Sequence, residues 1–371
     1  SDEYVFSGVD SLSPGAINQG ISLAEEKYGK YPLWLPWIFS GLPSVHSFQN
    51  ISSYYFPNYF CNFLNFLGLP SFWNYILHFI LAGMGVFLIL KELNVNRYSA
   101  FFGAISFSLM PYLITMVVHG HGSQMMTTAW LPWVIWGILR LYNYTNLSNL
   151  GFLALIVGLQ LQRAHVQIAY YTWMTAGLFL IMLLFNFYKN NNNKIKWIIY
   201  SISSFFLGLC MAMWIYLPVI NYTPYSIRSG GSQGGAGFEY ATAWSFSFSE
   251  IATFFIPSFF GFGGATYWGS MPFTDYPNYM GIIVLVFAII GSVFHERKIK
   301  WFFIITAVLA LILSFGKHFF LYSFFYNYFP YFSKFRVPVM LLVLTQFSIS
   351  ILAGLGLETI FNFANCDKKK I

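Results

Sequence analysis

Residues 160–171 read Gln-Leu-Gln-Arg-Ala-His-Val-Gln-Ile-Ala-Tyr-Tyr and lie between two apolar, helix-length segments. The apolar segment before them, 150–161, is short against the ~20 residues that a spanning helix needs. Arg163 and His165 therefore fall inside or close to a membrane, where a central arginine costs about 2.5–3.5 kcal/mol. Such an arginine reaches the interface, pairs with an acid or lines a wet cavity. Two interpretations stay open: a polar site below the outer surface, or a tight turn whose arginine extends outward.

The composition predicts a membrane protein. Of the 371 residues, 57% are hydrophobic and 8% are charged, whereas a soluble protein has about 25% charged residues. The mean hydropathy is +0.60. The formal net charge of +7 is therefore no argument for nucleic acid, and we expect the lipid bilayer as a partner and no nucleic acid.

Apolar segments of helix length predict an all-α, polytopic membrane protein. We expect about nine transmembrane helices, at 72–90, 99–118, 126–142, 148–162, 165–187, 197–220, 278–294, 301–315 and 337–361. Short basic tracts flank alternate loops, at Lys91 and Arg97, Arg140, Lys189 to Lys196, Arg297 to Lys300, and Lys368 to Lys370. The positive-inside rule makes these loops cytoplasmic. Residues 1–71, 119–125, 221–277 and 316–336 then face outward.

The predicted topology divides the chain into three parts. Residues 1–71 form an extracytoplasmic first loop, 72–361 the transmembrane bundle with its outer loop 221–277, and 362–371 a cytoplasmic tail. Aromatic stretches within the first loop, at 31–43 and 54–67, are too short or too proline-broken to span, so we expect interfacial helices there. Because the chain starts outside without an apolar leader, we also expect a membrane helix before residue 1. The basic C-terminus is either a cytoplasmic anchor or a cut before further sequence.

Two histidines mark the second outer loop, His119-Gly-His121-Gly. Histidines two residues apart between glycines can converge on a metal ion or a phosphate. The pattern alone is weak, because no third ligand is fixed by spacing. A metal ion, a phosphate or lipid contact, and a plain interfacial turn all stay open.

Charged residues in the other outer loops are further candidates for a site. Arg228 lies in a Gly-rich stretch, 226–239, which is either a mobile flap whose N–H groups bind an anion or a plain linker. Lys334 and Arg336 precede the last apolar segment, where paired cations suit a lipid phosphate or simple headgroup anchoring. Glu239 and Asp275 are acids of the third outer loop.

Taken in order, these stretches resemble the YfhO-like family of bacterial membrane proteins, within the GT-C class of polytopic glycosyltransferases. The likeness covers nearly the whole chain, although family members are usually longer at the C-terminus. The features that carry it are Asp10, the Trp/Pro/Gly run through Pro43, Gly120-His121-Gly122, 165–171, Arg228, 244–250 with 257–261, 267–281 and Phe335-Arg-Val-Pro338.

The resemblance implies a GT-C-like bundle in the bacterial cytoplasmic membrane with an extracytoplasmic active face. It implies transfer of a sugar from a polyprenyl-phosphate-linked donor to an envelope glycan, lipid or protein acceptor. Such chemistry needs a carboxylate base and cations for the departing phosphate. We assign Asp10 as the base, with Glu239 and Asp275 as alternative acids. The donor phosphate would be bound by Arg163, His165, Arg228, Lys334 and Arg336; His119 and His121 would orient it or bind a divalent metal ion.

Two other classes of function remain as alternatives. A transporter or flippase for lipid-linked glycans would need polar residues along a path through the membrane. The predicted segments hold few ionisable groups beyond His78 and Glu358, and none repeats another at a fixed period. A non-catalytic scaffold of the cell envelope is neither supported nor opposed by Asp10 and the basic residues.

Overall fold

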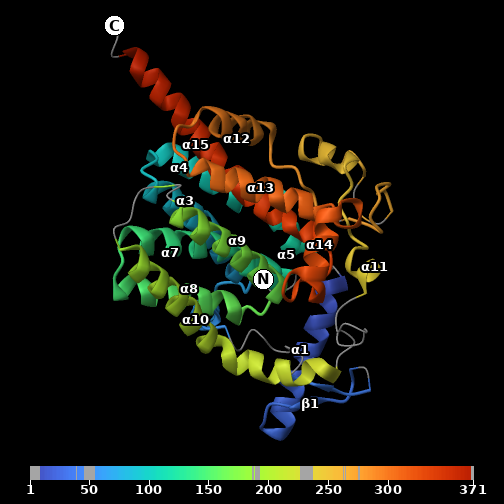
Figure 1. Ribbon diagram of the computed structural model, residues 1–371. Helices are drawn as coiled ribbons and strands as arrows, with labels where there is room; N and C mark the ends of the chain where they lie inside the picture. The colour runs from blue at the N-terminus through green and yellow to red at the C-terminus, as the bar shows by residue number, and fades with distance from the viewer. Residues whose placement is uncertain are drawn as a thin grey trace.

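Helices make up nearly all of the regular structure in the computed structural model (Figure 1), which describes residues 9–38, 40–45, 55–185, 188, 193–225, 237–261, 263, 265–274 and 276–368. Residues 9–14 and 365–368 are described by their helical backbone alone. The α-helices are α1 (Val9–Tyr28), α2 (Pro57–Phe66), α3 (Trp73–Glu92), α4 (Arg97–Ser108), α5 (Pro111–Val118), α6 (Gly122–Ala129), α7 (Leu131–Asn143), α8 (Leu147–Gln162), α9 (Val166–Leu184), α10 (Lys194–Tyr222), α11 (Phe238–Ala241), α12 (Ile282–Phe294), α13 (Lys300–Ser314), α14 (Phe320–Tyr328) and α15 (Leu342–Lys368). Short 3₁₀ helices are η3 (Thr223–Tyr225), η5 (Ser249–Phe254), η6 (Gly316–His318), η7 (Phe332–Lys334) and η8 (Pro338–Leu341).

Five helical stretches in the described part of the chain are long and apolar enough to cross a membrane. They are Trp73–Glu92, Arg97–Val118, Val166–Leu184, Lys194–Tyr225 and Pro338–Ala364. Shorter apolar helices cover Leu147–Gln162, Ile282–Phe294 and Lys300–Ser314. The prediction of an all-α membrane protein is confirmed, but the structure supports five spanning helices by length rather than nine.

Prolines explain two differences from the predicted segments. The segment at 99–118 consists of α4 and α5, which meet just before Pro111 at the first position of α5. The segment at 126–142 begins earlier, at Gly122, and breaks at Trp130 between α6 and α7, where Pro132 lies in the first turn of α7. Proline fits the first turn of a new helix, and the residue before Pro111, Met110, is extended with ψ 137°, as is usual before proline.

The described residues of the predicted first loop, 1–71, contain more regular structure than the sequence indicated. Residues 9–28 form α1, where we expected a loop, so Asp10 lies in the first turn of a helix. Of the two aromatic stretches, 54–67 contains helix α2 as predicted. The other, 31–43, is not a helix: β1 (Trp34–Leu35) and β2 (Leu42–Pro43) pair antiparallel, with Trp34 opposite Pro43. Its prolines and Gly41, which has a φ of +132°, suit a tight reversal rather than a helix.

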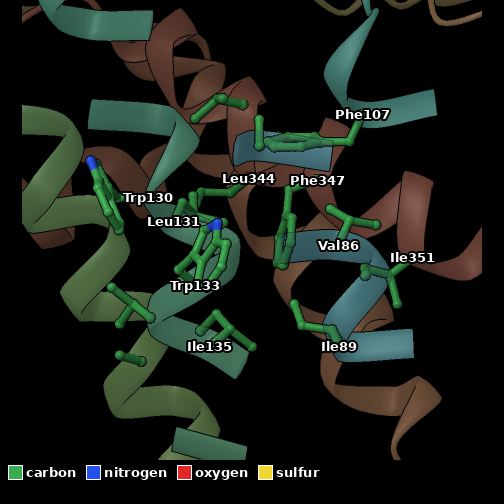
Figure 2. Close-up of a cluster of buried hydrophobic side chains, with 14 of the residues drawn as sticks. Val86, Ile89, Phe107, Trp130, Leu131, Trp133, Ile135, Leu344, Phe347 and Ile351 are labelled. Carbon is green, nitrogen blue, oxygen red and sulfur yellow. The ribbon is translucent and has the colours of Figure 1, made fainter. Parts of the chain in front are cut away.

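Helix α15 forms the centre of the bundle. It packs against α12, α13 and α4, while α8 packs along α10. In Figure 2, Phe347 of α15 faces Val86 and Ile89 of α3, and its ring meets Phe107 of α4 edge-on at 5.6 Å between centroids. All four side chains are fully buried, so this cluster joins the first, second and last of the five spanning stretches.

Glycines allow α12 and α15 to approach closely. A Cβ atom at Gly356 would lie 1.9 Å from the carbonyl oxygen of Phe287, and one at Gly291 would lie 2.1 Å from that of Leu352. Such distances are impossible for real atoms, so both positions require glycine. Small residues at helix crossings are the usual means of close packing in membrane proteins.

The two ends of the bundle differ. Figure 1 shows α1, β1, α11 and α14 gathered at one end, which we call the loop end, while the last turns of α15 project from the opposite one. At that opposite, tail end, Glu358 of α15 accepts a hydrogen bond from the backbone N–H of Asn96 at 3.0 Å. The labelled elements of three predicted outer segments, α1 and β1 of 1–71, α11 of 221–277 and α14 of 316–336, therefore lie at the loop end, and the C-terminal end of α15 lies at the tail end.

Candidate functional site

Arg163 is buried at the loop end. Helix α8 has 16 residues, or about 24 Å at 1.5 Å per residue, less than the ~30 Å of a bilayer core. Arg163 ends this helix, Ala164 adopts the left-handed region with φ +56°, and α9 begins directly after His165. A left-handed residue other than glycine costs roughly 1–2 kcal/mol. This strained reversal holds Arg163 inside the bundle at 6% exposure, so the interpretation of an outward-extending arginine is wrong.

Neutral groups surround the Arg163 guanidinium. Its Nη2 donates to Ser123 Oγ at 2.9 Å, and the guanidinium carbon lies 5.0 Å from the centroid of the Tyr55 ring. Its Nε has no hydrogen-bond partner, and no carboxylate of the described residues pairs with it. An unpaired buried charge is costly unless a partner arrives. The arrangement therefore suits an anionic ligand.

A chain of hydrogen bonds fixes Tyr55 beneath the guanidinium. The indole N–H of Trp130 donates to the Tyr55 hydroxyl at 2.8 Å, and that hydroxyl lies 2.7 Å from His78 Nε2. His78 Nδ1 lies 2.6 Å from the backbone oxygen of Asn74. A carbonyl can only accept, so Nδ1 carries the proton, Nε2 accepts and Tyr55 donates. Burial, the largest cause, raises the pKa of Tyr55 well above its usual value, which keeps this donor protonated.

His121 lies near Arg163, because it directly precedes α6 and Ser123, the hydrogen-bond partner of Arg163, follows two residues later. His121 Nδ1 is hydrogen-bonded to the Tyr276 hydroxyl, and both His119 and His121 meet the Tyr276 ring edge-on, at 6.1 and 5.7 Å between centroids. Within the described residues, no group of three His, Cys, Asp or Glu side chains could hold a metal ion.

Arg336 is tied to the same end through its backbone. Its carbonyl oxygen accepts from Gln167 Nε2, two residues after His165, and its guanidinium donates to the Tyr240 hydroxyl. The next residue, Val337, has φ +62°, an outlier for a β-branched residue. Its N–H donates to Ala241 at 3.0 Å. These contacts hold the partly exposed Arg336 close to the first turn of α9.

The other residues predicted for the site are at least partly exposed or lie outside the described structure. Glu239 is exposed on α11. Lys334 ends η7 and is partly exposed. The side chain of Asp10 lies outside the described structure, as do Arg228 and Asp275 altogether. The structure thus brings Arg163, His119 and His121 into one region with His165 beside it, and the base stays a prediction.

Glu250 is a buried acid that sequence reasoning left without a role. It is 1% exposed and accepts from Ser247 N and Oγ, both at 2.8 Å, from Ser270 Oγ at 3.2 Å and from the Tyr267 hydroxyl. The Ser-x-x-Glu spacing of 247–250 is the capping-box pattern, a signal that was available in the sequence. Four donors satisfy this carboxylate, so it joins Ser247 to Tyr267 and Ser270 and is not an open base. Tyr276 lines a cavity with Glu250 and Asn278, which connects this segment to His121.

Other residues of the candidate site lie in parts of the chain without a motif. Tyr55, Ser123 and Trp130 contact Arg163 or fix its partner, yet each reads as an ordinary residue in an aromatic or polar stretch. His78 was visible as an ionisable group within an apolar segment.

No family model matches this chain, and neither a curated protein nor a solved structure is found to be similar to it.

Proposed function

We propose that this chain is a membrane glycosyltransferase of the YfhO-like, GT-C type, which moves a sugar from a polyprenyl-phosphate-linked donor to an envelope acceptor. In this proposal, nine segments cross the bacterial cytoplasmic membrane, the five long helices together with shorter ones. The loop end then faces the extracytoplasmic side. The positive-inside charge pattern and the sequence resemblance support this arrangement.

The buried Arg163 carries the proposal. It is the described cation at the loop end with the least exposure, its Nε lacks a partner, and no described carboxylate neutralises it. A donor phosphate gains negative charge as its bond to the sugar breaks. Preorganised cations in a water-poor site stabilise such charge strongly. His121, on the adjacent loop, and His165, two residues after Arg163, would orient the phosphate.

Asp10 would supply the base. As the acceptor oxygen bonds to the anomeric carbon, its proton passes to the Asp10 carboxylate. The bond from that carbon to the phosphate oxygen breaks, and its electron pair stays on the lipid phosphate, which Arg163 binds. Attack from the face opposite the phosphate inverts the anomeric configuration.

Transfer and transport can be separated in proteoliposomes that contain the full chain, labelled polyprenyl-phosphate sugars and envelope acceptors. Wild type should transfer label to an acceptor, and Asp10→Asn should lower the rate by roughly 10²–10⁴-fold, as for loss of a general base. Glu26→Gln is the matched control, because Glu26 is an exposed acid of the same helix.

Equal rates for Asp10→Asn and Glu26→Gln would move the base to Glu239 or Asp275. Movement of the labelled lipid across the bilayer without transfer would reject the enzyme and favour a flippase. Neither transfer nor movement with any acceptor tested would favour the scaffold.

A further inference from the structure

We propose that a cavity at the tail end binds the phosphodiester headgroup of a membrane phospholipid. The cavity has a volume of about 430 Å³ and opens between the C-terminal ends of α3 and α7. Lys91, Glu92 and Arg140 supply its charges, and Trp136, Tyr144 and Tyr188 its aromatic rings. It shares no residue with the Arg163 site, so this inference does not rest on the proposed glycosyl transfer.

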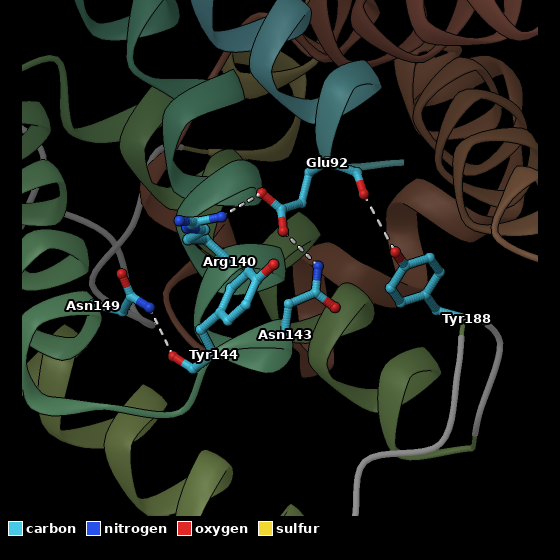
Figure 3. A network of polar contacts seen from close by, with 6 residues as sticks. All are labelled: Glu92, Arg140, Asn143, Tyr144, Asn149 and Tyr188. Atoms are coloured by element: carbon cyan, nitrogen blue, oxygen red, sulfur yellow. Dashed lines mark hydrogen bonds and ion pairs between the residues drawn. The ribbon is translucent and has the colours of Figure 1, made fainter. Parts of the chain in front are cut away.

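Glu92 and Tyr144 hold Arg140 in place, and several of its N–H donors stay available for a ligand (Figure 3). Its Nη1 lies 3.2 Å from Glu92 Oε2, and its guanidinium carbon lies 4.4 Å from the centroid of the Tyr144 ring. The Arg140 side chain is 40% exposed and that of Glu92 10%. A guanidinium has five N–H donors, so one hydrogen bond to Glu92 leaves several for a ligand in the open part of the cavity.

Two contacts anchor Glu92. Asn143 Nδ2 donates to Glu92 Oε1 at 2.6 Å, and the Tyr188 hydroxyl donates to the backbone oxygen of Glu92 at 3.3 Å. The carboxylate therefore fixes the orientation of Arg140 before any ligand arrives. A fixed guanidinium loses less conformational entropy on binding than a free one.

The charge balance selects the kind of phosphate. Lys91 and Arg140 contribute two positive charges and Glu92 one negative charge, which leaves one net positive charge among the residues that line the cavity. A phosphodiester carries a single negative charge and matches it. A phosphate monoester carries about −1.5 to −2 near neutral pH and would leave negative charge unpaired.

Apolar surface beside the cavity favours a lipid over free phosphate. The Trp136 ring meets Phe152 of α8 edge-on, with 5.5 Å between centroids. Phe152 and Leu155 are exposed on the outside of the bundle, at 39% and 41%. A headgroup in the cavity would thus have room for acyl chains along α8. Aromatic rings beside basic residues at helix ends are typical of headgroup level, and basic pockets between membrane helices bind lipid headgroups.

Native mass spectrometry of the detergent-purified full chain tests the inference. The probes are phosphatidylglycerol, diacylglycerol with the same chains, glycerophosphoglycerol and inorganic phosphate. We expect phosphatidylglycerol to bind and each of the others to bind at least ~10-fold more weakly, since each lacks the charged group or the chains. Inorganic phosphate bound as tightly as the lipid would indicate an ion site and overturn the lipid assignment. Diacylglycerol bound as tightly would show that the charges do not contribute.

Matched variants locate the binding. Arg140→Gln should weaken phosphatidylglycerol binding at least ~10-fold, as for loss of charge-assisted hydrogen bonds. Arg97→Gln should leave it unchanged, because Arg97 stacks on Tyr98 at 4.9 Å at the same end but outside the cavity.

A second pair keeps the test valid if Arg140→Gln fails to fold. Lys91→Gln should weaken binding, whereas Lys196→Gln, whose ammonium lies 5.3 Å from the centroid of the Tyr200 ring, should not. Wild-type affinity in both Arg140→Gln and Lys91→Gln would overturn the proposal.

Discussion

Arg163 at the loop end and Arg140 at the tail end occupy similar settings, but only Arg140 has a carboxylate as counterion. Each guanidinium lies over a tyrosine ring, 5.0 Å from Tyr55 in one case and 4.4 Å from Tyr144 in the other. Arg140 has a carboxylate partner and is 40% exposed, whereas Arg163 has neutral partners and is 6% exposed. The better-solvated arginine is thus the one that has its own counterion.

The difference indicates where an external anion has most to contribute. An exposed ion pair contributes roughly 0–1 kcal/mol because water already solvates both partners. A buried arginine without a counterion stays costly until an anion pairs with it. We therefore expect ligand binding to matter more at Arg163 for catalysis, and Arg140 to hold a lipid with little effect on the rate.

Replacing each arginine by glutamine tests this comparison, and we expect the largest effect on the rate of sugar transfer here. Arg163→Gln should lower sugar transfer by about 10²–10³-fold, because it removes a preorganised charge from the departing phosphate. Arg140→Gln should change the rate only slightly. The measurement is the initial rate in proteoliposomes that contain equal amounts of folded protein. Similar losses in both variants would show that the loop-end arginine has no special role.

Giving Arg163 the counterion that Arg140 already has should produce the next largest effect. Ser123 Oγ lies 2.9 Å from Arg163 Nη2, so Ser123→Asp would place a carboxylate beside the guanidinium. We expect transfer to fall at least ~10-fold, because the new pair competes with the donor phosphate. Ser123→Asn is the matched control, since it adds similar volume without charge. An equal loss in both variants would mean that volume, and not charge, decides.

Composition and helix-length apolar segments predicted the fold class well. They also located the reversal at 163–165, because Arg163 and His165 between two apolar segments are visible without a structure. Two differences had local signals: Pro111 and Pro132 start new helices. Helix α1 had none, since most of its residues are polar or small and it contains Pro14 and Gly15.

The partners of the candidate site could not be predicted, since they are far apart in the chain. Tyr55 and Trp130 are 75 residues apart, and Arg163 and Ser123 are 40 apart. No periodicity relates such pairs; α6 brings them together, because it packs against α3 and is contacted by Gln160 and Arg163 from the end of α8. By contrast, the Glu250 network is local enough that its Ser-x-x-Glu pattern was readable.

Tyr55→Phe separates the two roles of this tyrosine, its ring and its hydroxyl. The ring would stay under Arg163, but Trp130 Nε1 and His78 Nε2 would both lose the hydroxyl that joins them. Leaving buried polar groups without partners costs about 1–3 kcal/mol. Thermal unfolding in detergent should therefore show a lower Tm. Tyr144→Phe, at the exposed counterpart, should leave Tm nearly unchanged, and an equal Tm for Tyr55→Phe and wild type would mean that water replaces the hydroxyl.

Glu92→Gln makes the tail end resemble the loop end, but we expect only a small effect on stability. The substitution removes the counterion of Arg140 but keeps a side chain that can accept from Asn143. Since Arg140 is 40% exposed, water can solvate it, and the loss of stability should be about 1 kcal/mol or less.

The same substitution, Glu92→Gln, would raise the net charge of the residues that line the cavity from one to two. A phosphate monoester lipid such as phosphatidic acid should therefore gain affinity relative to phosphatidylglycerol. Native mass spectrometry of the two lipids on wild type and Glu92→Gln measures that ratio. An unchanged ratio would show that the cavity does not select its ligand by charge, and the contrast between the two arginines would then rest on burial alone.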